Sequence, residues 1–177
     1  MELPSIPKVN IGPGRDHTCG GWISPEELLT MKEEIVIEGR LCAIILRSTL
    51  DQPGIQFFTP NEFSQQLASM SYPAGKTIPA HTHNPVHREV FQTQETLFIR
   101  KGKLRVDFYT ESREYRASRI LGAGDVILLI AGGHGFEVLE QLNMVEVKQG
   151  PYAGEADKTR FVGNLPQELK FGPESNP

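Results

Sequence analysis

Three of the five histidines lie within seven residues of one another, and their spacing can create a metal site. His81 and His83 follow the stretch Thr77-Ile78-Pro79, which is typical of the end of a strand. Successive strand side chains point to opposite faces, so these two imidazoles are expected to share a face. Two imidazoles on one face can bind a single metal ion, and further ligands have to come from other strands. Glu95 and His134 are the natural candidates.

Two rival ligands lie between the histidine pair and the candidate carboxylate. Eleven residues separate His83 from Glu95, and they include His87 and Glu89. We favour Glu95 because six residues separate it from an expected turn at Gly102. His87 is expected to be a loop residue, or to donate a hydrogen bond to a ligand. The alternative for the histidine pair is two half-buried imidazoles bonded to backbone carbonyls.

Short strands between Gly and Pro turns are expected to position these residues. The apolar, β-branched stretches are bounded by turns at residues 51–54, 101–103 and 122–125. This pattern is typical of a β-sandwich or barrel. The expected strands are residues 34–49 with a break at a glycine, 55–59, 61–73, 95–100, 104–110, 126–131, 135–140 and 143–150.

The regions on either side of the strands are expected to be irregular. Ser24 can cap a helix and Pro25 suits its first position, so a short helix is predicted to end near Lys32 or Glu33. The expected organisation is an N-terminal arm over residues 1–33, a barrel over residues 34–150 and a C-terminal tail over residues 151–177.

Two stretches of the chain resemble the paired motifs of the cupin superfamily. Gly75 is followed after five residues by His81-Thr82-His83, and Glu95 is followed after six by Gly102. The pair Gly124-Asp125, an apolar strand and then His134 approximate the second motif. The resemblance covers about residues 55–150. It implies a double-stranded β-helix, or jelly-roll barrel, with a metal in its mouth held by His81, His83, Glu95 and His134.

The chain departs from the family pattern at several positions. Eleven residues stand before Glu95 where the family has three or four. Ile130 and Val138 replace the usual proline and asparagine of the second motif. The tail stretch AGEADKTRF resembles the C-terminal segment of small bacterial cupins that accompany polysaccharide biosynthesis. The alternative for this stretch is a tail that packs on the barrel or on a second subunit.

The resemblance implies a divalent transition metal and a small polar ligand. Three imidazoles and a carboxylate suit Zn, Fe, Ni, Mn or Co. We expect a metal-dependent isomerase, epimerase or dioxygenase acting on a small metabolite, with a sugar-related substrate as one option. Tyr72, Arg88, Glu89 and Glu137 are unranked candidates for an acid or base. The alternative is a non-catalytic module that binds a sugar or a carboxylate.

Composition excludes several other classes of function. The net charge of −4 argues against a nucleic-acid surface, and no apolar run approaches the roughly 20 residues of a membrane span. The start MELPSIPKVN lacks the features of a secretory signal, so we expect a cytoplasmic protein, and the plainer expectation for Cys19 and Cys42 is free thiols. We also expect a homodimer, because strand-like residues 34–47 carry more apolar surface than one exposed edge should show.

Overall fold

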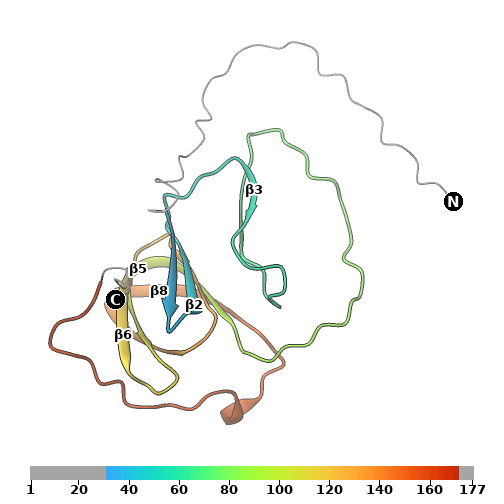
Figure 1. Cartoon of the computed structure of the whole chain (residues 1–177). Helices are drawn as coiled ribbons and strands as arrows, with labels where there is room; N and C mark the ends of the chain where they lie inside the picture. The colour runs from blue at the N-terminus through green and yellow to red at the C-terminus, as the bar shows by residue number, and fades with distance from the viewer. Residues whose placement is uncertain (1–30, 172–177) are drawn as a thin grey trace.

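The computed structural model describes residues 31–171, and nearly all of its regular structure is β-sheet (Figure 1). The strands are β1 (Lys32–Ile37), β2 (Arg40–Leu46), β3 (Gly54–Phe57), β4 (Ala68–Ser71), β5 (Glu95–Tyr109), β6 (Tyr115–Leu121), β7 (Val126–Leu129) and β8 (Gly133–Lys148). One 3₁₀ turn, η1 (Gly154–Asp157), follows them. No helix within residues 31–171 is long and apolar enough to cross a membrane.

Six strands form one antiparallel sheet, in the order β1-β2-β7-β5-β6, with β8 on the other side of β5. The first part of β5 pairs with β7 and its second part pairs with β6, while β8 runs along almost its whole length. The register between β5 and β8 shifts around Gly102, which has φ +87°. The irregular hydrogen-bond ladder around Gly102 marks the place where the two-stranded ribbon of β5 and β8 bends.

The sheet curls into a half-barrel around an apolar core. Buried side chains from both halves of β5 face the same cluster, so the two halves pack against each other across it. The core contains Ile35, Ile37, Ala43, Ile45, Leu97, Ile99, Leu104, Val106, Phe108, Ala117, Leu121, Ile127 and Leu129. A second cluster covers the opposite face of β2 and β7, where Ile44 and Leu128 pack against Phe58 and Leu67. This is why the stretch CAIIL is apolar on both faces.

The all-β expectation is confirmed at this level, and three details of it are corrected. The expected hairpin at residues 101–103 is a bend within one continuous strand, because β8 pairs with β5 on both sides of Gly102. The two strands expected at residues 135–140 and 143–150 are likewise one strand, β8. The start of the expected helix at Ser24 lies outside the described residues, and Lys32 and Glu33 belong to β1.

The surplus apolar residues of the first two strands belong to the protein's own core. Ile35, Ile37, Ala43 and Ile45 are all at most 4% exposed. Cys42 is also buried, while Cys19 lies outside the described residues. The apolar content that suggested a subunit interface is therefore largely accounted for within one chain.

The C-terminal segment, residues 149–171, packs against the outside of the half-barrel. The backbone N–H of Ser118 donates to the carbonyl of Lys170, and the ring of Phe161 meets that of Tyr109 edge-on at 5.3 Å. Figure 1 shows this segment, in orange to red, passing around the strands. A tail packed on the barrel was one of the two expectations from the sequence.

Candidate functional site

The curl of the sheet brings Glu95 and His134 together. In the register of β5 and β8, Glu95 pairs with Lys148, and His134 pairs with Phe108, thirteen residues further along β5. A straight strand would hold these positions about 43 Å apart at roughly 3.3 Å per residue. Nε2 of His134 nevertheless lies 3.3 Å from Oε2 of Glu95. The bend near Gly102 therefore closes the ribbon so that its two ends meet.

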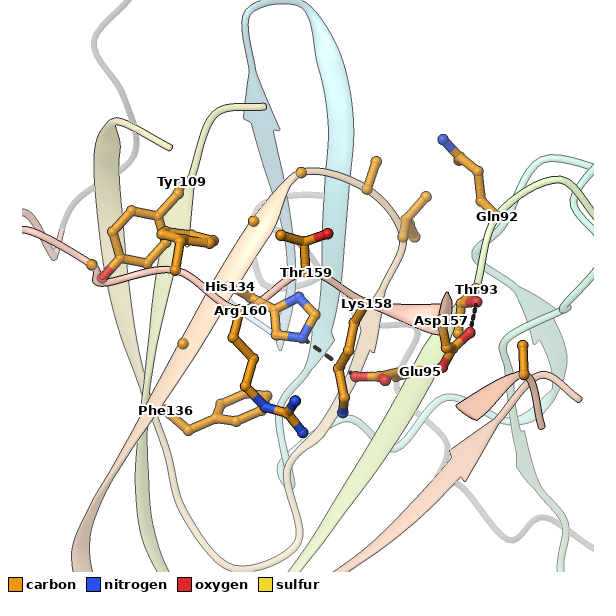
Figure 2. Close-up of a pocket in the computed structure, with 18 of the residues that line it drawn as sticks. Gln92, Thr93, Glu95, Tyr109, His134, Phe136, Asp157, Lys158, Thr159 and Arg160 are labelled. Atoms are coloured by element: carbon orange, nitrogen blue, oxygen red, sulfur yellow. Dashed lines mark hydrogen bonds and ion pairs between the residues drawn. The ribbon is translucent and has the colours of Figure 1, made fainter. Parts of the chain in front are cut away.

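The His134–Glu95 pair lies in a pocket of about 870 Å³ (Figure 2). The walls come from the ends of β5 and β8, from the residues just before β5, and from the C-terminal segment. The polar side chains that line the pocket are Gln92, Thr93, Glu95, Tyr109, His134, Glu146, Asp157, Lys158, Thr159 and Arg160. This volume lies within the range of about 300–1,000 Å³ that is usual for small-molecule sites.

The surroundings of Glu95 favour its ionised form. Its side chain is only 15% exposed, and that of His134 is 30% exposed. The hydrogen bond from His134 lowers the pKa of Glu95 below its ordinary value of 4.5, against the opposing effect of burial. The positive charges of Lys148 and Lys158 add to this lowering of the pKa. The pocket therefore holds a carboxylate that is ionised at neutral pH.

The C-terminal segment is fixed to the pocket wall through Asp157. Its carboxylate pairs with the ammonium group of Lys148 and accepts a hydrogen bond of 2.9 Å from the hydroxyl of Thr93. These two contacts lower the pKa of Asp157. Thr93 lies two residues before the start of β5, so this anchor joins the tail to the same end of the strand that carries Glu95.

The structure places His81 and His83 elsewhere. Both lie in residues 72–94, called here the histidine segment, which contains no helix or strand and whose residues 72–93 are all exposed. Their rings are 5.2 Å apart, and Nδ1 of His81 lies 3.1 Å from the carbonyl of Pro79. Figure 1 shows this segment, in green, as a wide loop that extends away from the half-barrel.

The expected strand end at the two histidines is therefore wrong for this structure. Pro79 and Pro85 flank the pair and have no N–H to give to a ladder. No strand lies beside His81 or His83 among the described pairings. Without strand geometry, the argument that alternate side chains share a face does not apply to them.

The four expected metal ligands do not form one group as the chain lies here. Within residues 31–171, no cluster of three or more His, Cys, Asp or Glu side chains is arranged to hold a metal ion. Glu95 and His134 do lie side by side, and their separation of 3.3 Å is that of a hydrogen-bonded pair. The same separation is compatible with two ligands of one tetrahedral ion, whose ligating atoms lie about 3.4 Å from each other at bonds of about 2.1 Å.

The other candidates lie outside the pocket. His87, Arg88 and Glu89 are exposed on the histidine segment. Tyr72 follows β4, and Glu137, on β8, forms an ion pair with Arg105 on β5. None of these five lines the pocket.

Among the pocket residues that were not singled out from the sequence, two carry a positive charge. Lys158 and Arg160 belong to the C-terminal segment and line the pocket beside the His134–Glu95 pair (Figure 2). The available signal was the alternation of basic residues in Asp157-Lys158-Thr159-Arg160. Nothing local in that stretch indicates that it returns to the barrel.

Comparison with known proteins gives no assignment, because no family model, curated protein or solved structure matches this chain.

Proposed function

We propose that the protein is a metal-dependent enzyme of the cupin type, a double-stranded β-helix that acts on a small polar metabolite in the pocket of about 870 Å³. The observation that carries the proposal is the meeting of Glu95 and His134 inside that pocket. The two residues come from separate motifs, 39 positions apart in the sequence. A divalent ion (Zn, Fe, Ni, Mn or Co) would be held by this pair.

His81 and His83 are proposed to complete the coordination from the histidine segment. Phe91, Gln92 and Thr93, at the end of this segment, already line the pocket. His83 and Glu95 are twelve positions apart in the sequence, and an extended chain of that length spans about 40 Å. The imidazoles are thus within reach of the pocket, although the conformation described here leaves them outside it.

The pocket suits metal-assisted chemistry on a polar substrate. A bound divalent ion supplies a Lewis acid that polarises a carbonyl or activates water. The carboxylate of Glu95 is held ionised, because the hydrogen bond from His134 lowers its pKa, and in that form it can bind a metal ion.

A second candidate is a non-catalytic module that binds a sugar or a carboxylate. It is favoured by one observation: Tyr72, Arg88, Glu89 and Glu137, the acid or base candidates from the sequence, all lie outside the pocket. An enzyme turns over a substrate when loaded with metal, whereas a binding module retains its ligand unchanged. Mass spectrometry of the ligand after incubation with the protein separates the two.

Metal titration of the full chain tests the proposal. After removal of metals with a chelator, calorimetry with Zn²⁺, Ni²⁺ and Mn²⁺ should give one ion per chain. Loss of an outer hydrogen-bond partner costs about 10–100-fold in metal affinity, so loss of a ligand in Glu95→Gln or His134→Ala should cost at least that much. His81→Ala should also weaken binding. Glu89→Gln is the matched control and should bind as the unaltered chain does.

The pattern of losses discriminates between the possible sites. Equal loss in Glu89→Gln with Glu95→Gln unaffected would move the carboxylate ligand to the histidine segment. Unchanged metal content in His81→Ala, Glu95→Gln and His134→Ala would refute the site as a whole. Far-UV circular dichroism of each variant shows whether it has kept its fold.

A further inference from the structure

Two cationic side chains of the C-terminal segment share the pocket with the His134–Glu95 pair. The backbone at Lys158 is extended, with φ −153° and ψ 150°. In extended backbone, side chains two residues apart lie on the same side. Figure 2 shows both side chains running from the segment in the same direction, past His134 and toward the level of Glu95.

These two cations retain most of their capacity to bind a ligand. Within the described part of the chain, no ion pair or hydrogen bond joins Lys158 to a neighbour, and its charge acts on Glu95 and Asp157 only from a longer distance. Arg160 pairs with Glu155 at 2.9 Å, but the two side chains are 71% and 83% exposed. Such exposed pairs contribute little, so a ligand can displace this one at small cost.

The carboxylates that face the two cations are mostly engaged. Asp157 is held by Lys148 and Thr93, and Glu95 is paired with His134. Glu146 is the remaining carboxylate of the pocket wall. The side of the pocket formed by Lys158 and Arg160 therefore offers two positive charges to a ligand that lies against His134.

We propose that Lys158 and Arg160 bind an anionic group of the metabolite, a phosphate or a carboxylate, and hold its polar end at the His134–Glu95 pair. This inference rests on the proposed function, because it assigns a substrate class to the same pocket. A guanidinium group binds both oxygens of such an anion in a planar fork, and an ammonium group adds a point charge. Because both cations come from the C-terminal segment, that segment would set the choice of substrate.

Anion binding by the metal-free full chain tests the inference. Inorganic phosphate and malonate are the two probes, titrated by calorimetry at low ionic strength because salt screens exposed charges. Each cation is expected to donate one hydrogen bond to the charged anion, and the loss of one such bond lowers the affinity for the anion about tenfold. Lys158→Gln and Arg160→Gln should therefore each bind the probes about tenfold more weakly. The double variant should bind about 100-fold more weakly. Lys170→Gln removes the same charge from the same segment outside the pocket, and it should leave the affinity unchanged.

The comparison of probes identifies the anion, and the variants decide the inference. Tighter binding of phosphate supports a phosphorylated metabolite, and tighter binding of malonate supports a carboxylic acid. Equal affinity of the double variant and the unaltered chain for both probes would overturn the inference. So would a loss in Lys170→Gln as large as that in the double variant, or the absence of binding at millimolar concentration.

Failure of the metal site and failure of the anion site give different results. If anions bind through Lys158 and Arg160 but no metal binds, the anion site stands and the metal-dependent function falls. If metal binds through Glu95 and His134 but the anion affinity ignores both cations, the anion site falls alone.

Discussion

Replacing Gly102 with alanine should disrupt the bend that brings Glu95 and His134 together. Gly102 has φ +87°, and a Cβ atom added there would lie 2.2 Å from the carbonyl oxygen of Gln141 on β8. Cβ atoms in proteins almost never approach another heavy atom within 3.0 Å. The two strands would therefore have to separate by about 1 Å or change their path at the point where the ribbon bends.

The expected cost has two parts that a control can separate. An L-residue in the left-handed region costs about 1–2 kcal/mol. Separation of the strands should add about 2 kcal/mol through lost ladder hydrogen bonds at about 1 kcal/mol each, so Gly102→Ala should lose about 3–4 kcal/mol. Gly39 has φ +74° with no atom within 4 Å of an added Cβ. Gly39→Ala should therefore show the conformational part alone, about 1–2 kcal/mol.

Urea unfolding followed by far-UV circular dichroism measures both variants, and metal titration of Gly102→Ala while it is folded measures the effect on the site. The bend accounts for the meeting of Glu95 and His134, so Gly102→Ala should also bind metal more weakly, and Gly39→Ala should not. Equal unfolding free energies for Gly39→Ala and Gly102→Ala, with unchanged metal affinity in both, would refute the reasoning about the bend.

Three further predictions concern the core, pH and assembly. Asp125 is 6% exposed and accepts hydrogen bonds from the backbone N–H groups of Ser48 (2.8 Å) and Gly122 (3.0 Å) and from the side chain of Arg47 (3.1 Å). Asp125→Ala should therefore lower the free energy of unfolding in urea by about 3–5 kcal/mol. A loss below about 1 kcal/mol would contradict this. The folded-state pKa of Glu95 lies below 4.5, so the stability that its ionised form contributes is present above pH 4.5 and is lost as pH falls through the lower folded-state value. The difference in unfolding free energy between the unaltered chain and Glu95→Gln should therefore shrink as pH falls over that range. A difference that does not depend on pH would argue against the pairing of Glu95 with His134. Among the described strands, β1 pairs only with β2 and leaves one edge of the sheet open. We therefore predict a homodimer, with twice the 19.7 kDa of one chain in light scattering. A mass near that of one chain at micromolar concentration would exclude the homodimer.

The sequence predicted the features that depend on local chemistry. The turn at Gly124-Asp125 is one, because glycine accommodates φ +89° there and the aspartate satisfies nearby backbone donors. The strands on either side of Gly39 are another, because their β-branched residues favour extended backbone. These preferences are set within a few residues, so they can be read without knowledge of the fold.

The features that the sequence could not predict depend on pairing at long range. Lys101-Gly102-Lys103 is compatible with either a hairpin turn or a bend, and the choice depends on β8, which pairs with both sides of it. The placement of His81 and His83 depends on whether a neighbouring strand accepts them, and none does among the described pairings. Lys158 and Arg160 reach the pocket because contacts of Asp157 and of Phe161 anchor the tail on either side of them.

The most direct test of the proposed centre is anomalous X-ray scattering from crystals of the full chain grown with Zn²⁺. The proposed function predicts one zinc peak per chain in the pocket, about 2.0–2.2 Å from Nε2 of His134 and from a carboxylate oxygen of Glu95. A peak bound only by His81 and His83 outside the pocket, or no peak at all, would contradict it.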